Sequence, residues 1–143
     1  MPKSKFIFLM IPVAGALMII VLLFRDQPDV PADPNQHATR VSVAASQQFH
    51  QSLNDERFSG ICQSADPDAF ESPCTEYIPA FRLKMGRFLA TRVQKTDAGP
   101  SMVSITAESR FESGVVAESF RFSVDAGQKA ATLVSYRAQP VSR

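Results

Sequence analysis

An uninterrupted apolar run near the N-terminus constrains the fold more than any other feature of this sequence. Residues 6–24 read FIFLMIPVAGALMIIVLLF and contain no charged or strongly polar side chain. A helix of this length rises about 28 Å at about 1.5 Å per residue, which nearly matches the roughly 30 Å hydrocarbon core of a bilayer. The run therefore predicts a single transmembrane helix.

The charges on either side of the run predict its orientation. Lys3 and Lys5 precede the run, whereas the following RDQPDVPAD carries one arginine and three aspartates. The positive-inside bias therefore places residues 1–5 in the cytoplasm and the rest of the chain across the membrane. A cleaved signal peptide is the alternative, but its apolar core spans only about 7–15 residues and a cleavage site follows closely. We expect a bacterial inner-membrane protein with one span and a periplasmic domain.

The anchor is followed by a segment that cannot bury an apolar face. Residues 25–38 read RDQPDVPADPNQHA, with three prolines and three aspartates. This composition predicts an extended linker, so the exported domain is expected over residues 39–143. The whole chain has 15 basic and 14 acidic residues. This balance gives no indication of a nucleic-acid partner.

The two cysteines, Cys62 and Cys74, lie in the exported part of the chain. In an oxidising compartment such a pair is more often bridged than free, and we expect a structural disulfide, with unpaired thiols as the alternative. A zinc site would need three or four ligands, and a redox motif would have C-x-x-C spacing. The sequence therefore predicts no metal and no cofactor.

Helical spacing opens the domain. Val41, Ala45, Phe49 and Leu53 recur every four residues, which predicts an amphipathic helix of roughly 15 residues that ends near NDER. A short second helix is expected around FSGIC, before Pro67. A third is expected over TEYIPAFRLKM, where the next residue, a glycine, is placed as its C-terminal cap.

Strand-like alternation follows the third helix. The runs RFLATRVQK, MVSITAESRF, VVAESFRFSV and KAATLVSYRAQ are separated by glycine-containing turns and predict a four-stranded antiparallel meander. For the middle hairpin, a Ser113-Gly114 turn would bury one apolar face. It would pair Val103 with Val124, Ile105 with Phe122, Ala107 with Phe120 and Phe111 with Val116. For the last hairpin, either Ala131/Leu133 or Val134/Tyr136 could point inward.

Together these elements predict an α+β domain in which the long helix lies across the sheet. The helix pattern A..F...L, then ERFSGICQSADPDAF, then F..KMGRF entering hairpins, resembles the nuclear-transport-factor-2-like (cystatin-like) superfamily. The pattern is most similar to small exported bacterial domains of that fold without an assigned activity. The resemblance implies a cone-shaped domain over about residues 41–138. The superfamily includes isomerases, dehydratases, ligand-binding domains and a single-span subunit of type IV secretion systems, so the fold does not decide the function.

Acid–base candidates are few. They are His50, Asp55, Tyr77, Glu118 and Tyr136. His50 lies about 100° from the apolar stripe and is expected at the helix surface or boundary. Glu118 shares a face with phenylalanines but lies toward the predicted turn. We therefore interpret it as an edge carboxylate, with a pocket group as the alternative.

We expect a non-enzymatic, membrane-tethered domain that binds another envelope protein or itself. The first alternative is a small-ligand domain with an apolar pocket, and the second is an isomerase- or hydrolase-like enzyme centred on Glu118. The pocket residues would be Phe49, Leu53, Ile105, Glu118, Phe120 and Phe122. A basic stretch is expected to be a solvated surface or to contact lipid headgroups or an acidic partner. It comprises Arg82, Lys84, Arg87 and Arg92.

Overall fold

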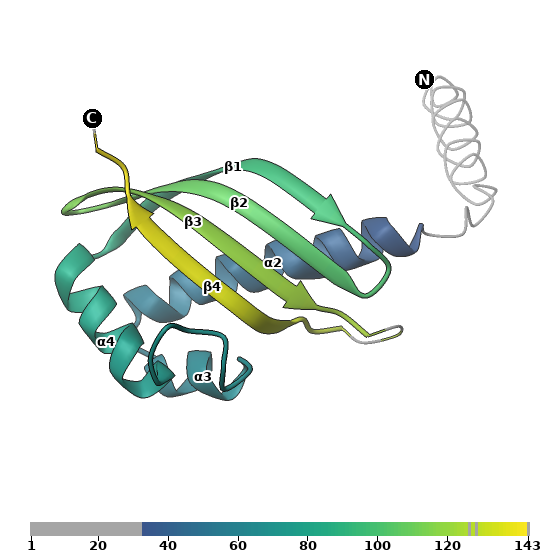
Figure 1. Cartoon of the computed structure of the whole chain (residues 1–143), viewed down its shortest axis with the longest axis horizontal. Coiled ribbons are helices and arrows are strands. Elements are labelled where there is room, and N and C mark those ends of the chain that lie inside the picture. Colours follow the sequence, from purple (N-terminus) through teal and green to yellow (C-terminus); the bar gives the residue numbers. More distant parts are fainter. Residues whose placement is uncertain (1–32, 126, 128, 143) are drawn as a thin grey trace, which may run out of the picture. The chain divides into compact units, whose positions relative to one another are not determined.

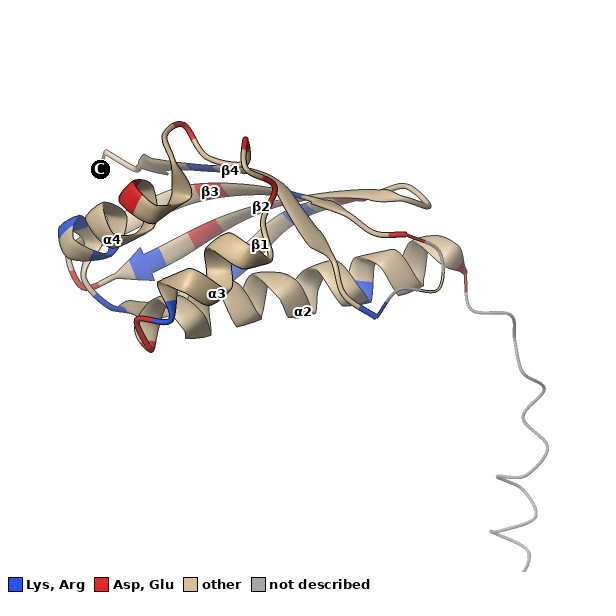
Figure 2. Cartoon of the chain, turned by 90° about the horizontal axis from the view of Figure 1, so that it is seen from below, with Lys and Arg blue, Asp and Glu red and all other residues tan. Residues whose placement is uncertain are grey.

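The computed structural model describes residues 33–125, 127 and 129–142. Three helices, α2 (Pro34–Asn54), α3 (Phe58–Gln63) and α4 (Cys74–Met85), precede four strands. The strands are β1 (Phe88–Ala98), β2 (Met102–Phe111), β3 (Gly114–Ser123) and β4 (Thr132–Pro140). They form one antiparallel sheet in the order β1-β2-β3-β4, with α2 running across one face (Figures 1 and 2). The predicted α+β architecture is confirmed.

The predicted anchor, residues 6–24, lies outside the described residues. None of the helices in the described part of the chain is both long and apolar enough to cross a membrane.

Helix α2 starts five residues before the predicted domain boundary at residue 39. Asp33 caps the helix by accepting a hydrogen bond from the backbone N–H of Asn35 at 3.0 Å, and Pro34 occupies the first turn. Both residues suggested a linker in the sequence, but aspartate as an N-cap and proline at the first helical position also favour a helix start. The predicted linker of 25–38 is therefore too long by residues 34–38.

The face of α2 that meets the sheet is rotated from the predicted apolar stripe. Val41 and Ala45 are only partly buried, whereas Ser42 and Ser46 are buried. These small side chains let the helix lie close to a sheet face crowded with phenylalanines. The hydroxyl of Ser46 donates to the backbone oxygen of Val43, which satisfies it locally.

The predicted disulfide is present. It joins Cys62 in α3 to Cys74, the first residue of α4. Closing a loop with a sequence separation of 12 residues stabilises the fold by about 3 kcal/mol in the chain-entropy model.

The register of the middle hairpin differs from the prediction by two residues. Ile105 faces Phe120 rather than Phe122, and Ala107 faces Glu118 rather than Phe120. The reason is the turn. Phe111 pairs directly with Gly114, because the Ser113 N–H and hydroxyl both donate to the Met85 carbonyl at the end of α4. Because the shift is even, the predicted apolar face is preserved. The other corrected pairs are Val103 with Phe122 rather than Val124, and Phe111 with Gly114 rather than Val116.

The last hairpin combines the two alternatives left open by the sequence. A bulge leaves Val134 without a partner, because Phe122 pairs with Leu133 and Arg121 pairs with Ser135. The bulge changes the phase of β4, so both Leu133 and Tyr136 are buried.

Gly86 caps α4 as predicted, with a φ of +75° that favours glycine. A Cβ at this position would lie 2.6 Å from Glu112 Oε2. This oxygen accepts a hydrogen bond from the backbone N–H of Arg87. We expect Gly86→Ala to lower the free energy of unfolding by about 1–3 kcal/mol, measured by urea titration of the full chain in detergent micelles.

The matched control is Gly60→Ala in α3, where nothing lies within 4 Å of an added Cβ. That variant is expected to be unchanged or stabilised by up to about 1 kcal/mol. Equal stabilities for the two variants would contradict the role assigned to Gly86.

Candidate functional site

A buried carboxyl group lies at the centre of the domain. Glu118 is 1% exposed, and its Oε1 accepts a hydrogen bond from Tyr136 Oη at 2.6 Å. Its Oε2 lies 2.8 Å from His50 Nε2 and also accepts the hydroxyl of Ser109. We call these four residues the polar cluster.

The polar cluster is assembled from α2 and three strands. Glu118 lies directly opposite Ala107 on β2 and Ala138 on β4, and these small side chains leave room for the carboxyl group. Ser109 and Tyr136 are its diagonal neighbours on the same two strands, within reach of a long side chain.

His50 is the sequence-predicted candidate whose position differs most from the expectation. It was expected at the helix surface or boundary but is 3% exposed. Its ring stacks on Phe88 with centroids 4.0 Å apart and an interplanar angle of 5°, and it meets Phe120 edge-on. The rotation of α2 described above turns this ring toward the sheet.

The surroundings of the two tyrosines near Glu118 raise the pKa of both hydroxyl groups. Burial raises the pKa of Tyr136 well above its ordinary value, and the negative charge of Glu118 and its hydrogen bond raise it further. Burial also raises the pKa of Tyr77, with smaller contributions from the charges of Glu71 and Glu118. The other predicted candidate, Asp55, is exposed and pairs with Arg57 at 3.0 Å.

The interpretation of Glu118 as an edge carboxylate was wrong. The two-residue register shift moves it opposite Ala107, and α2 covers it through His50. Its side chain is 0% exposed, and each of its oxygens already has a partner. The geometry is that of a satisfied polar core.

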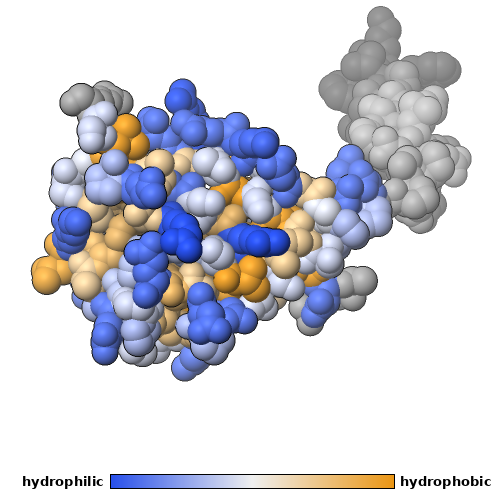
Figure 3. All heavy atoms as spheres, in the orientation of Figure 1, coloured by the Kyte–Doolittle hydropathy of each residue, from blue (hydrophilic) through white to orange (hydrophobic). Residues whose placement is uncertain are grey.

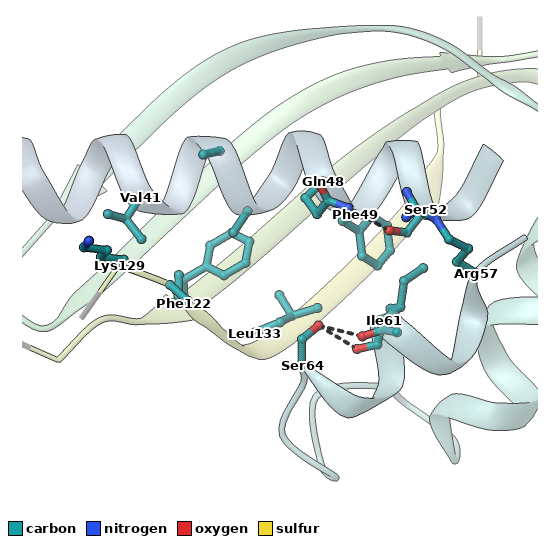
Figure 4. Close-up of a pocket in the computed structure, with 15 residues that line it drawn as sticks. Val41, Gln48, Phe49, Ser52, Arg57, Ile61, Ser64, Phe122, Lys129 and Leu133 are labelled. Atoms are coloured by element: carbon teal, nitrogen blue, oxygen red, sulfur yellow. Dashed lines mark hydrogen bonds between the residues drawn. The ribbon is translucent and has the colours of Figure 1, made fainter. Parts of the chain in front are cut away.

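A separate groove lies between α2, α3 and the start of β4 (Figure 4). Its volume is about 490 Å³, and Phe49 and Phe122 line it, as do Ile61 and Leu133. Two cations, Arg57 and Lys129, lie at its border, and no acidic residue is among its lining residues. The remaining predicted pocket residues, Leu53, Ile105, Glu118 and Phe120, are buried and do not line it.

The four residues of the predicted basic stretch differ in their exposure to solvent. Lys84, Arg87 and Arg92 are exposed, whereas the Arg82 side chain is only 17% exposed and lies 3.9 Å from Glu56. Sequence reasoning missed two exposed leucines, one on α4 and one on β1: Leu83 is 89% exposed and Leu89 is 53% exposed. The sequence did contain a signal for the exposure of Leu83, because this residue falls outside the apolar stripe of Tyr77, Phe81 and Met85. We call the exposed residues around the junction of α4 and β1 the leucine–cation patch; they are Leu83, Lys84, Arg87 and Leu89.

Hydrophilic and hydrophobic residues are interleaved over the face seen in Figure 3. Within the described part of the chain, no group of three His, Cys, Asp or Glu side chains is arranged to hold a metal ion.

The element order, the antiparallel meander and the helix across one face are those implied by the resemblance in the sequence. The domain therefore has the arrangement that the resemblance to nuclear-transport-factor-2-like proteins implies. One matching solved structure is a protein described as NTF2-like and of unknown function, from Cytophaga hutchinsonii. It is 13% identical, with a TM-score of 0.42, and the match covers 80% of this chain and 95% of that one. No protein-family model matches the sequence, and no curated protein is significantly similar to it.

The polar cluster predicts a large effect of a nearly isosteric change. Glu118→Gln replaces one accepting oxygen by an N–H₂ group that faces either Tyr136 or the Ser109/His50 pair. We expect the free energy of unfolding to fall by about 1–3 kcal/mol, because a buried donor loses its acceptor. The matched control is Glu108→Gln on β2, whose side chain is only partly buried, and its effect should stay within about 0.5 kcal/mol. Similar small losses in both variants would show that the cluster does not stabilise the core.

The raised pKa of Tyr136 predicts a loss of stability at alkaline pH. Above about pH 10 the unfolded chain releases the Tyr136 proton while the folded chain retains it. The unfolded state then binds fewer protons, so stability falls by up to about 1.4 kcal/mol per pH unit until the folded pKa is reached. Tyr136→Phe should remove this part of the slope, measured by urea unfolding between pH 8 and roughly pH 11.5. An unchanged slope in that variant would contradict the assignment.

Proposed function

We propose that this chain is a membrane-anchored periplasmic domain that binds another protein, as an accessory or assembly subunit of an envelope complex, without catalysing a reaction. The observation that carries the proposal is the leucine–cation patch. A leucine with 89% of its surface exposed gains nothing from the fold of its own chain. Apolar side chains that stay exposed in the folded domain can be buried when a partner binds.

The distance between anchor and domain supports a partner at the membrane. If residues 6–24 form the anchor, only residues 25–33 separate it from α2. A fully extended chain of that length reaches about 30 Å at most. The domain would therefore work close to the bilayer, where the cations of the patch could also approach anionic headgroups.

The buried position of Glu118 counts against the enzyme alternative, because its side chain is 0% exposed and both of its oxygens already accept hydrogen bonds from the protein. A specific observation does favour the ligand-binding alternative. The groove of about 490 Å³ between α2, α3 and β4 is within the size range of small-molecule sites and has an apolar floor. Its cationic border would suit an amphiphile with a negatively charged head.

The test is crosslinking of the full-length protein in its own membranes, with a photoreactive residue placed at position 83. We expect a defined set of envelope proteins, and we expect Leu89→Gln in the same background to reduce their yield at least about threefold, because an apolar contact is removed.

The matched control is Met102→Gln, which makes the same kind of change at a side chain that is 36% exposed and lies outside the patch. Recovery of this chain alone would indicate self-association. A yield that Leu89→Gln leaves unchanged would exclude the patch as the binding surface.

A further inference from the structure

The outer edge of β4 is covered along only part of its length. The Asp66 N–H donates to the Leu133 carbonyl at 2.7 Å, and the Tyr136 N–H donates to the Ala69 carbonyl at 2.8 Å. The segment 66–69 therefore occupies the edge beside the first half of the strand.

The second half of this edge is uncovered. Backbone groups alternate along a strand, so the N–H and C=O of Ala138 point away from β3, as those of Tyr136 do. The Pro140 position is consistent with this alternation, because an edge strand tolerates a residue without N–H where the N–H would face outward. Within the described part of the chain, no hydrogen bond to the Ala138 N–H or C=O is found on this side.

A groove lies beside this uncovered edge. It has a volume of about 510 Å³ and runs between α4 and the end of β4. Tyr77 and Phe81 of α4 form an aromatic wall, with their rings stacked at 6.1 Å and an interplanar angle of 8°. Ala138 and Pro140 line the opposite side.

The groove carries opposite charges at its two ends. Glu76 and Lys84 both line it and form no ion pair with any described residue, whereas Glu71 is paired with Arg137 at 2.9 Å. Glu76 adjoins Tyr77, whose ring lies 6.2 Å from that of Tyr136. Lys84 adjoins the other end, where Met85 and Pro140 line the groove.

The spacing of these charges matches an extended chain. Eight residues of helix rise about 12 Å, and four residues of strand rise about 13 Å. In a strand, residues two and four apart face the same side. A segment with a basic residue, an apolar residue and an acidic residue at alternate positions would therefore place all three over the groove.

We propose that this groove binds an extended segment of a partner protein, which pairs with β4 at Ala138 and carries a basic and an acidic side chain four residues apart. The proposal rests on the protein-binding function given above and assigns it a second contact surface. Strand addition beside a helix is an established mode of peptide recognition, in which backbone bonds give affinity and side-chain sites give specificity. A second copy of this chain fits less well, because the segment 66–69 prevents pairing along the full edge.

The probe is the pentapeptide Lys-Thr-Val-Thr-Glu with both termini capped, and the reference peptide is Ala-Thr-Val-Thr-Ala. The affinity of each is measured by titration against the full chain in detergent micelles. We expect the charged peptide to bind about fivefold more tightly, from two exposed ion pairs. Glu76→Lys should remove this preference. Asp125→Lys, the same change at an exposed loop position outside the groove, should preserve it.

Hydrogen exchange tests the backbone pairing directly. At saturation with the charged peptide we expect the Ala138 amide to exchange at least about tenfold more slowly, and Ala138→Pro to abolish binding. Unchanged exchange, no binding of the charged peptide, or equal affinity for the two peptides would overturn the proposal. Slowed exchange that depends on protein concentration without peptide would assign the groove to a second copy and also overturn it.

Different results would overturn the proposed function and the proposal for this groove. Crosslinked envelope proteins together with no peptide binding would leave the proposed function intact and remove only this groove from it. Failure to crosslink any other protein, even when the peptide binds, would remove the proposed function itself.

Discussion

The buried carboxyl group of Glu118 is the constraint on which the rest of the domain depends. A carboxyl group without partners in an apolar interior costs several kcal/mol, so the fold must supply hydrogen bonds from every direction. His50 supplies one from α2, Ser109 one from β2 and Tyr136 one from β4. The cluster therefore helps to hold the helix in position over the sheet. It also supports the register of the middle hairpin, together with the Ser113–Met85 contact, and the phase of the last strand, together with the bulge at Val134. Apolar packing tolerates small slips, whereas a satisfied polar cluster does not, because a slip of any one element would leave an oxygen or a donor unpaired.

Local patterns predicted the elements well, because each element carries its own signal. Apolar residues at every fourth position predicted α2, and Gly86 predicted the end of α4. The alternation of apolar and polar residues predicted all four strands. What the sequence could not determine was how these elements meet. The start of α2 was missed because aspartate and proline favour both a linker and a helix start. The hairpin turn was misplaced because Ser113 is recruited by the carbonyl of Met85, a contact between residues far apart in the chain.

The candidate site shows the same limit more strongly. Glu118 and Tyr136 were recognised as candidates by residue type, and His50 was too, but the sequence suggested that the histidine and the carboxylate were exposed. Their burial depends on a helix rotation and an even register shift, neither of which changes the local pattern. Conversely, Leu83 looked like an ordinary helix residue, and only the packing of α4 shows that no described residue covers it. Burial and exposure are properties of the assembled domain, so patterns of single elements could not give them.

The covering of the β4 edge gives the disulfide a role beyond cross-linking the chain. Asp66 and Ala69, whose backbone groups occupy the first half of the edge, both lie within the loop that Cys62 and Cys74 close. An edge strand with free backbone groups is a template for pairing with other chains, and proteins limit this by covering the edge. Before the cysteines are oxidised, the loop is held to the strand by fewer constraints, and molecules in that state would present a longer bare edge to one another. The disulfide therefore also favours the covered state of the β4 edge, in which the short stretch around Ala138 stays accessible.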